Sequence, residues 1–335
     1  MKRKRIELDL SIDVGNTQVC VYAKDYKDIF DSCFNAIKKG LVNDNCIEFT
    51  DNKKEDTMYQ VIFTGEQQKD YAKKKELANK VFISYALYRY VVDKKIDINN
   101  TDITINLALG TPVKEWDNET VSLMKSWFKK PISFECNGIN IMYSIKRLIV
   151  CPQGLAYQKV NKSSLLKYDI AYIIDMGGFT VDVVKVVRGV AQADSVHSLK
   201  IGSVKWLTRL AEAIESDFEF EHYSVKQAEL AVKNGFFINP NTGRKVNILK
   251  QYPDIIKEAA NELVGGLYKI TNKEIMASGR TILFGGGTYT WAQTLTKTFN
   301  NVKAMDEPEM QNAKDFFKML KAAKSQNLGL LQEDK

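Results

Sequence analysis

The chain has 335 residues, 44% of them hydrophobic and 10% aromatic, which is enough to bury the cores of two domains and excludes global disorder. The net charge of +7 comes from lysines spread along the chain, a pattern typical of solvated surfaces that does not support direct nucleic-acid binding. No run of about 18 apolar residues occurs, so a transmembrane helix is excluded.

The N-terminal residues and the cysteines indicate a cytoplasmic protein. Glu7, Asp9 and Asp13 interrupt the first apolar stretch, so we expect a strand there and not a signal peptide. The five cysteines form no CxxC pair and their number is odd, which argues against a disulfide framework and a structural zinc site. The two histidines, His197 and His222, are too few for His-based metal or nucleophilic catalysis.

The first elements alternate strands with turns. Residues 8–14 alternate apolar and polar side chains, which predicts a half-buried strand. Gly15-Asn16 suits a two-residue hairpin turn, with residues 19–23 as the return strand. The polar stretch over residues 24–66 is expected to be irregular, apart from a strand at 61–64.

The middle of the chain alternates helices and strands. We expect helices at residues 69–92 and from Asp117 or Asn118 to 128, on either side of an apolar strand at 103–109. Asn137-Gly138 predicts a hairpin of residues 132–136 and 139–143. A strand at 146–150 then leads through Pro152-Gln153-Gly154 into a helix.

The last part begins with a second strand pair and ends in a helix. Residues 171–174 and 181–187 are expected to be strands, and a further buried strand is expected at 281–284. Helices are expected at four places, residues 203–215, 224–234, 253–273 and 290–299. A final amphipathic helix at 312–324 is expected to pack Phe316, Phe317 and Leu320 against the body of the protein.

A coarse internal repeat organises these elements. A strand that ends in aspartate, a glycine-containing turn and a return strand occur at Asp13 and again at Asp175. At such a turn several backbone N–H groups point in one direction, and glycine lets a phosphate approach closely. The aspartate before the turn is suited to holding Mg²⁺. Each turn alone is also a common structural motif, but the pair is suited to phosphoryl chemistry.

A third glycine-rich segment follows the buried strand at residues 281–284. Gly285, Gly286 and Gly287 lead from this strand into a helix, an arrangement that binds anions or nucleotides at the helix N-terminus. The segment matches neither GxGxxG nor GxxxxGK[ST], so neither a dinucleotide-binding fold nor a P-loop is supported. It is equally compatible with a plain strand–turn–helix junction.

Together these segments resemble the superfamily of actins, sugar kinases and heat-shock chaperone ATPases. The resemblance covers most of the chain and is carried by Asp13-x-Gly15-Asn16-Thr17, Pro152-Gln153-Gly154, Asp175-x-Gly177-Gly178-x-Thr180-x-Asp182 and Gly285-Gly286-Gly287. Within the superfamily the chain is most similar to actin-like plasmid-segregation proteins of the ParM type. That narrower similarity lies in residues 105–112 and in Glu307-Pro308-x-x-x-Asn312-Ala313-Lys314-x-Phe316.

The resemblance implies a fold and a site. The fold is α/β, with two similar domains around a cleft for ATP or GTP: residues 1–168 with a returning helix at 306–335, and residues 169–305. Asp13 and Asp175 would position Mg²⁺, and Gln153 would orient the attacking water. The phosphates would be held by Gly15, Asn16, Thr17, Gln18, Gly177, Gly178, Phe179 and Thr180. Lys226, Glu229, Gly285, Gly286, Gly287 and Tyr289 would surround the nucleoside.

The resemblance also implies a function. A ParM-type protein hydrolyses ATP, assembles with copies of itself into filaments and segregates plasmid DNA through a DNA-binding adaptor, without direct membrane binding. A small-molecule kinase of the same fold is the alternative, but it needs a carboxylate base, and the nearest candidates, Glu115 and Asp117, resemble helix-start residues. A non-polymerising regulatory ATPase is a further alternative.

Overall fold

The computed structural model describes residues 4–15, 17–38, 44–50, 57–61, 75–98 and 101–331. The chain forms two compact units. Unit 1 contains residues 1–63, 67–156 and 312–335, and unit 2 contains residues 64–66 and 157–311. In the described part, the chain therefore passes from unit 1 to unit 2 after Ala156 and returns after Gln311.

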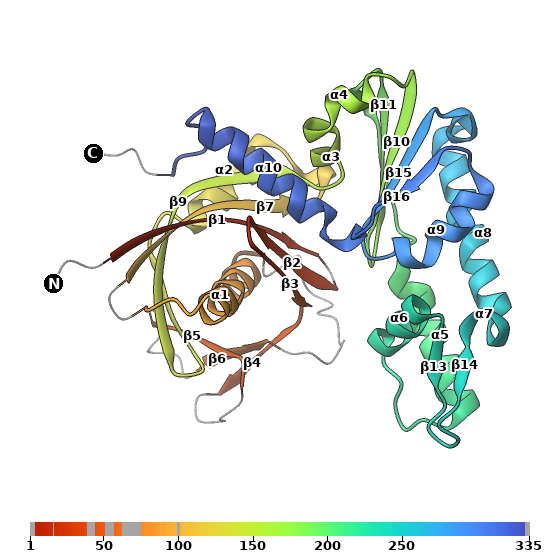
Figure 1. The fold of residues 1–335 in the computed structure, drawn as a ribbon, viewed down its shortest axis with the longest axis horizontal. Helices are drawn as coiled ribbons and strands as arrows, with labels where there is room; N and C mark the ends of the chain where they lie inside the picture. Colours follow the sequence, from red (N-terminus) through yellow and green to blue (C-terminus); the bar gives the residue numbers. More distant parts are fainter. Residues whose placement is uncertain are drawn as a thin grey trace. The chain divides into compact units, whose positions relative to one another are not determined.

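Unit 1 is built on a curled mixed sheet, nine-stranded in the part that the structure describes (Figure 1). Its central strands β1, β7 and β9 are parallel to one another, and the other pairings are antiparallel. The order is β3-β2-β1-β7-β9-β8-β5-β6-β4. The strands are β1 (Lys4–Val14), β2 (Gln18–Ala23), β3 (Tyr26–Asp31), β4 (Phe34–Lys38), β5 (Cys46–Phe49), β6 (Thr57–Val61), β7 (Thr101–Thr111), β8 (Ile132–Cys136) and β9 (Ile139–Pro152).

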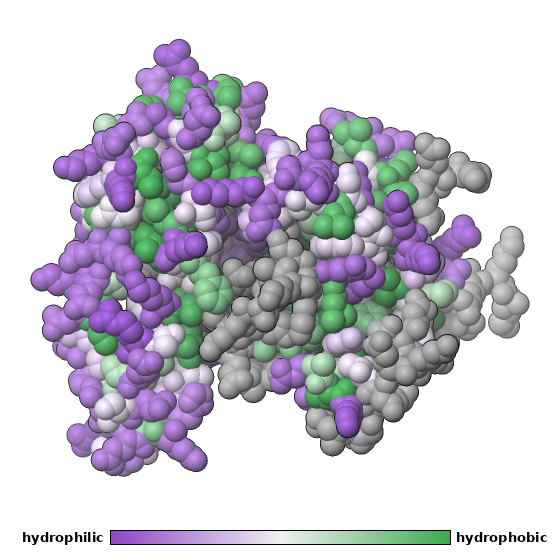
Figure 2. Space-filling model, turned by 180° about the vertical axis from the view of Figure 1, so that it is seen from behind, coloured by the Kyte–Doolittle hydropathy of each residue, from purple (hydrophilic) through white to green (hydrophobic). Residues whose placement is uncertain are grey.

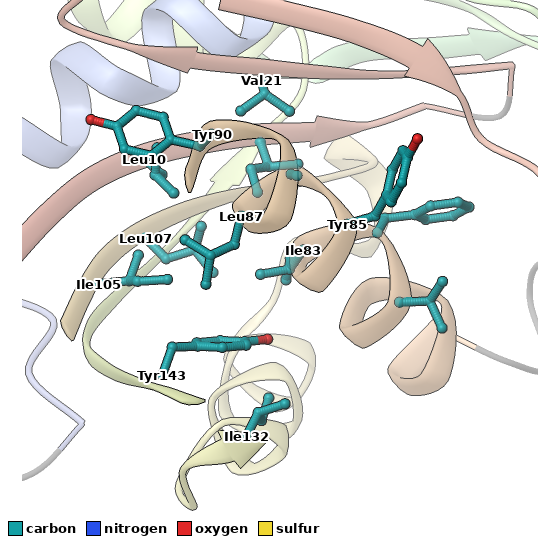
Figure 3. Packing of buried hydrophobic residues seen from close by; sticks show 14 of the residues in the cluster. Leu10, Val21, Ile83, Tyr85, Leu87, Tyr90, Ile105, Leu107, Ile132 and Tyr143 are labelled. Atoms are coloured by element: carbon teal, nitrogen blue, oxygen red, sulfur yellow. The ribbon is translucent and has the colours of Figure 1, made fainter. Parts of the chain in front are cut away.

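Helix α1 (Lys75–Asp93) fills the inside of this curled sheet (Figure 1). Ile83 and Leu87 point from α1 toward Leu107 on β7, and the neighbouring strands add further apolar side chains (Figure 3). Full burial of each aliphatic side chain of this kind stabilises the folded protein by about 1.5–3 kcal/mol. The helix that was predicted at residues 69–92 is confirmed from Lys75 onward, and residues 69–74 lie outside the described part.

The opposite face of the central strands carries α10 (Gln311–Ser325) (Figure 1). On β7, Leu107 and Leu109 belong to the cluster around α1, whereas Ala108 lies in a second cluster with Phe316 and Leu320 of α10. Phe317 contacts the Tyr22 ring edge-on, with 5.4 Å between ring centroids. The final helix therefore packs against the body of unit 1, as predicted, and β7 is buried on both faces, which explains its continuous apolar sequence.

The prediction that residues 24–66 are irregular was wrong. The described residues there form β3, β4, β5 and β6, and of the strand predicted at 61–64 only Val61 is described. The strands are short, and polar residues alternate with buried ones such as Phe34, Tyr59 and Val61. Because only one face of these strands meets the core, their mean polarity conceals the period-2 pattern.

The predicted helix from Asp117 or Asn118 and the predicted hairpin at 132–143 were confirmed, whereas the strand predicted at 146–150 is the continuation of β9 and not a separate strand. Asp117 caps α2 (Asn118–Trp127) by accepting the Thr120 N–H at 2.7 Å. The predicted hairpin joins β8 to β9, and its turn residues Asn137 and Gly138 have φ of +49° and +76°. Positive φ at both positions is the requirement that makes Asn-Gly a strong hairpin signal.

Unit 2 contains a five-stranded mixed sheet, in the order β12-β11-β10-β15-β16, and a small two-stranded sheet. Helices flank the larger sheet, and the four predicted helices and three predicted strands of this region were confirmed. The strands are β10 (Ile170–Met176), β11 (Val181–Val187), β12 (Val190–Leu199), β13 (Phe236–Ile238), β14 (Lys245–Asn247), β15 (Arg280–Phe284) and β16 (Val302–Ala304). The helices are α3 (Leu155–Val160, which begins in unit 1), α4 (Lys162–Leu165), α5 (Ser203–Phe218), α6 (Val225–Asn234), α7 (Ile248–Gln251), α8 (Pro253–Thr271) and α9 (Thr288–Thr298).

The two central sheets begin in the same way, which confirms the predicted α/β class with a duplicated mixed-sheet core. In unit 1, β1 pairs antiparallel with β2 and parallel with β7. In unit 2, β10 pairs antiparallel with β11 and parallel with β15. The repeat that is visible in the sequence is therefore a repeat of topology.

Figure 2 shows the hydropathy of the residues on one face of the molecule. On the face shown in Figure 2, hydrophilic residues predominate and hydrophobic residues form small groups. Among the described residues, no helix is long and apolar enough to cross a membrane.

A network of charged side chains attaches the C-terminal end of α10 to β1. Lys324 lies 2.9 Å from both Glu7 and Asp9, and Lys321 lies 3.1 Å from Asp9. The buried Asn106 donates to the same two carboxylates at 2.7 and 2.8 Å. The hydrogen bonds from Lys324 and Asn106 lower the pKa of Glu7 from 4.5 to about 2.

This network predicts a loss of stability in acid. A carboxyl group whose pKa is lowered by folding stabilises the protein above its ordinary pKa, and this contribution disappears as the pH falls from about 5 toward 2. Glu7→Gln should therefore lower the urea unfolding midpoint at pH 7 and flatten its decline between pH 5 and pH 3. The control Glu76→Gln breaks a single exposed ion pair with Lys80 and should change the midpoint little. A decline as steep in Glu7→Gln as in the wild type would contradict the prediction.

Candidate nucleotide-binding site

The turn after β1 is closed by a backbone hydrogen bond from the Gly15 N–H to the Gln18 carbonyl oxygen, 2.9 Å long. The enclosed positions are therefore 16 and 17, one residue later than predicted, and Asn16 lies outside the described residues. A Cβ at Gly15 would lie 2.8 Å from the Gln18 oxygen, so a larger residue would open the turn. Glycine is therefore required here because the strand partner approaches so closely.

Asp13 is a buried carboxylate at the end of β1, with 8% of its surface exposed. The Gln153 side-chain amide donates to its Oδ1 at 2.7 Å, and Asn312 provides a second amide hydrogen bond. Burial raises the pKa of Asp13, and these two hydrogen bonds oppose that rise. Both donors are neutral amides, which can fix the orientation of the carboxylate but cannot balance its charge. Among the described residues, no cation is among the partners of Asp13.

Gln153 reaches Asp13 because of its position just after β9. Its backbone N–H donates to the Thr111 carbonyl at 2.9 Å, which extends the β7–β9 pairing by one residue. Gly154 follows with φ of +73°, a backbone conformation that favours glycine and turns the chain into α3. The predicted Pro152-Gln153-Gly154 motif therefore serves to place the Gln153 amide against Asp13.

The turn after β10 repeats the geometry of the first. The Gly177 N–H donates to the Thr180 carbonyl at 2.9 Å, and a Cβ at Gly177 would lie 3.0 Å from that oxygen. Asp175 lies two positions before this glycine, as Asp13 does before Gly15. Both predicted phosphate motifs therefore have the same closing hydrogen bond, the same steric need for glycine and the same placement of the aspartate.

Helix α5 determines the orientation of the second turn. The N–H groups of Gly202, Ser203 and Val204 donate to three successive turn carbonyls, at 3.1, 3.2 and 2.9 Å. These carbonyls belong to Phe179, Gly177 and Gly178 respectively. In the part of the chain that the structure describes, the N–H groups of Gly178, Phe179 and Thr180 donate to no backbone carbonyl. With the carbonyls turned toward α5, these N–H groups are suited to bind an anion.

Asp175 has a second carboxylate as its neighbour. In the β10–β11 register Asp175 is directly opposite Asp182, and the two residues are 7% and 9% exposed. Directly opposed residues point to the same face of a sheet, where two buried like charges repel each other unless a cation or proton intervenes. Asp182 belongs to the predicted glycine motif but was not predicted as a site residue. The hairpin register, which follows from the sequence, would have placed it opposite Asp175.

The third glycine segment packs directly on the second turn. Gly285 has φ of +86°, and a Cβ on it would lie 2.5 Å from Oδ1 of Asp175 and 2.6 Å from the Met176 oxygen. The Gly287 N–H donates to the same Met176 oxygen at 2.8 Å. The glycines thus let β15 and the start of α9 approach the end of β10, and the structure brings the second and third motifs together.

The residues predicted around the nucleoside also converge within unit 2. On α6, Lys226 lies 3.3 Å from Glu229, whose Oε1 would be 3.9 Å from a Cβ at Gly286. The Tyr289 hydroxyl donates to Glu309 at 2.6 Å, and Lys233 lies over the Tyr289 ring, 4.1 Å from its centroid. Lys233 and Glu309 were not predicted. Lys233 lies two helical turns after Lys226, on the same side of α6, which is a signal that the sequence contained.

The arrangement is compatible with Mg²⁺ as well as with phosphate. Among the described residues, no group of three or more acidic, histidine or cysteine side chains is arranged so that it could hold a metal ion. Mg²⁺ does not require one, because it commonly binds one or two carboxylates and completes its coordination with water and substrate phosphates. Within unit 1 Asp13, and within unit 2 the opposed Asp175 and Asp182, are each the type of oxygen ligand that it prefers.

The comparisons with known proteins agree with this fold. Residues 173–297 match the family model for the C-terminal part of the archaeal MreB-like actin homologues. The solved actin-like protein Alp7A is 15% identical over 96% of this chain and 98% of its own, with a TM-score of 0.76. The archaeal actin homologue Ta0583, solved with ADP, is 18% identical over 94% of this chain and 99% of its own, with a TM-score of 0.71. The comparison with curated proteins found no match.

A ParM protein from Clostridium botulinum, solved as a 15-stranded filament, is also similar. It is 17% identical over 96% of this chain and 100% of its own, with a TM-score of 0.70. Matches over nearly the whole length of both chains confirm the predicted actin-like fold. At these identities they establish the fold, and the function has to be argued from the site.

Gly202 provides a test of how the second turn is built. A Cβ at this position would lie 2.3–2.4 Å from backbone atoms of Gly178 and Phe179. Gly202→Ala should therefore lower the free energy of unfolding by about 1–3 kcal/mol, the usual cost of overpacking. The control Gly265→Ala adds a methyl group to α8 with no atom within 4 Å, and should leave stability equal or raise it by about 1 kcal/mol. Equal stability of the two variants in urea denaturation would refute the packing argument.

Proposed function

We propose that this protein is an actin-like ATPase that binds Mg-ATP and polymerises into nucleotide-dependent filaments. The observation that carries the proposal is the duplicated turn, in which a buried aspartate precedes a glycine whose N–H closes the hairpin. The second turn presents the backbone N–H groups of residues 178–180 for phosphate oxygens, and each turn places a buried carboxylate that would suit a divalent cation. Two copies of such a turn in one chain are more than strand connection alone requires.

The comparisons support nucleotide binding and self-association. Among the similar solved structures, Ta0583 and a ParM protein from Bacillus thuringiensis are complexes with ADP. The Clostridium botulinum ParM protein is a filament. We extend both properties to this chain because the fold is shared and because the residues that the proposal needs are present.

The proposed roles follow the geometry of each unit. Asp13 and Asp175 would hold Mg²⁺, which when bound neutralises phosphate charge. Residues 15–18 and 177–180 would hold the phosphates through backbone N–H groups and side chains of the two turns, except that the Gly15 and Gly177 N–H groups already close the hairpins. Because Nε2 of Gln153 donates to Asp13, its Oε1 would be the atom that accepts a hydrogen bond from the attacking water and orients it, so the predicted role is compatible with the observed contact.

The nucleoside would bind at the predicted residues of unit 2. Lys226 and Glu229 provide a donor and an acceptor beside Gly286, and the Tyr289 ring provides an apolar surface. Gly285 and Gly287 both pack against the backbone of Met176, so their own backbone groups would also line the nucleoside site. ATP is the proposed nucleotide and GTP the alternative, because backbone groups discriminate weakly between the two bases.

The biological role that we propose is segregation of plasmid DNA in the cytoplasm. In this role the filament is the moving element, and a separate DNA-binding adaptor links it to DNA. Direct nucleic-acid binding is not proposed because the lysines are spread along the sequence. No membrane attachment is proposed because the apolar face of α10 packs on β7 and β2.

The structure does not favour the small-molecule kinase. Of the two candidate bases, Asp117 already accepts the backbone N–H of Thr120 as the N-cap of α2. This hydrogen bond lowers the pKa of Asp117, which makes it a weaker proton acceptor. Glu115 lies in the short helical turn at Val113–Glu115 just before this cap.

Polymerisation can be measured directly. Addition of Mg-ATP to the purified protein should raise right-angle light scattering within minutes, and negative-stain microscopy of the same sample should show filaments. Phosphate release should accompany the rise, and EDTA should abolish both signals. No scattering over a wide range of protein and salt concentrations, despite measured ATP binding, would overturn the filament proposal and favour a regulatory ATPase; phosphate transfer to an added sugar would favour a kinase.

A further inference from the structure

Asn312, at the start of α10, joins three segments of the chain. Its Oδ1 accepts the Gly154 N–H at 3.2 Å, and its side chain also forms a hydrogen bond with the Asp13 carboxylate. The residue is 5% exposed, so both contacts are shielded from water. Because Oδ1 is the acceptor for Gly154, the amide NH₂ is the group that donates to Asp13.

The chemistry of these contacts requires a short neutral amide. A carboxylate at position 312 would face the Asp13 carboxylate, and an apolar residue would leave the Gly154 N–H and one Asp13 oxygen without this partner. An amide supplies one acceptor and one donor at the distance that the two partners need. Asn312 therefore matches its surroundings in charge, hydrogen-bonding groups and length.

Asn312 lies at the point where the chain returns from unit 2 to unit 1. It is the first residue of unit 1 after residues 157–311 of unit 2, and Gly154 lies two residues before Ala156, where the chain enters that stretch. Asp13 lies at the end of the central strand β1. A single side chain thus links the strand-end carboxylate to both segments through which the chain passes between the units.

Asn312 is not needed to attach α10 to the sheet, because other residues do so. The Ser11 hydroxyl donates to the Ala313 carbonyl at 2.7 Å from the neighbouring position on β1. Phe316 packs so closely on β7 that a Cβ at Gly110 would lie 2.8 Å from its ring. The charged network around Lys324 holds the other end of the helix.

We propose that Asn312 is a positioning residue that orients the Asp13 carboxylate for a divalent cation and connects that carboxylate to both crossing segments. The inference rests on the proposed function, because it assigns Asp13 to Mg²⁺. It accounts for the Asn312-Ala313-Lys314-x-Phe316 segment, to which the proposed function gives no role. Residues that orient a metal ligand in this way commonly change metal affinity by about 10–100-fold when removed.

The test compares Asn312→Ala with Ser11→Ala. Both variants remove a buried hydrogen bond between β1 and the first turn of α10, but only the first removes a contact of Asp13. The melting temperature is measured with saturating ATP across a Mg²⁺ titration. Asn312→Ala should raise the Mg²⁺ concentration for the half-maximal shift about tenfold or more, and Ser11→Ala should leave it unchanged.

A second readout uses the protein without nucleotide or metal. Hydrogen exchange of the Gly154 amide should be faster in Asn312→Ala and unchanged in Ser11→Ala, because only Asn312 accepts that N–H. The nearly isosteric Asn312→Leu should behave as Asn312→Ala does, which shows that the lost hydrogen bonds and not a cavity are responsible.

The outcomes separate this inference from the proposed function. If the wild type shows no Mg²⁺-dependent shift with ATP or GTP, the proposed function fails. If the wild type responds and Asn312→Ala has the same Mg²⁺ dependence as Ser11→Ala, the function stands and the positioning role of Asn312 is refuted.

Discussion

The structure depends on keeping a carboxylate buried at the end of a central strand. Asp13 and Asp175 occupy this position in β1 and β10, and each is less than a tenth exposed. A buried carboxylate destabilises a protein unless hydrogen bonds or cations compensate for it. Unit 1 compensates with two neutral amides, whereas unit 2 places a second carboxylate, Asp182, opposite the first. In unit 1 the two amides orient the carboxylate but do not neutralise its charge, which a bound cation would do.

The glycines around these carboxylates serve close packing more than flexibility. Gly110 lies against Asp13 and Phe316, and Gly285 lies against Asp175 and the Met176 backbone. At each of these positions a methyl group would collide with a carboxylate oxygen. The neighbouring strand is thereby brought directly beside the aspartate, which limits the directions from which a ligand can reach it. The two units thus share this local geometry through the same pair of residue types, an aspartate and a neighbouring glycine.

The sequence predicted the elements whose signal is local. Asn137-Gly138 needs only its own two residues to specify a turn, and buried strands such as β15 appear as apolar runs. The strands β3, β4, β6 and β12 were missed because they bury mainly one face or neither, so that their polar residues resemble loops. Three of the four residues of β5 are buried, but the strand is too short to show a period. The shift of the first turn by one residue was missed because strand pairing, and not the Gly-Asn dipeptide, determines where the hairpin closes.

The candidate site was predicted where its residues lie in motifs and missed where they are distant in sequence. The glycine turns and their aspartates lie within hairpins, so spacing alone indicated them. The contact of Asn312 with Gly154 spans 158 residues, and the contacts of Glu309 with Tyr289 and Lys233 depend on the packing of α6, α9 and the Pro308–Met310 turn. No local pattern encodes such contacts, because they follow from the tertiary fold.

The most direct test of the account is Mg²⁺-dependent nucleotide binding to the wild type, Asp13→Asn and Asp175→Asn, measured by calorimetry with and without EDTA. The account predicts one nucleotide per chain in the wild type, with affinity that falls steeply in EDTA. Each single variant should lose this Mg²⁺ dependence while it remains folded, because both turns contribute to the same activity. Retention of wild-type Mg²⁺-dependent affinity in either variant would contradict the proposed role of that aspartate in Mg²⁺ binding.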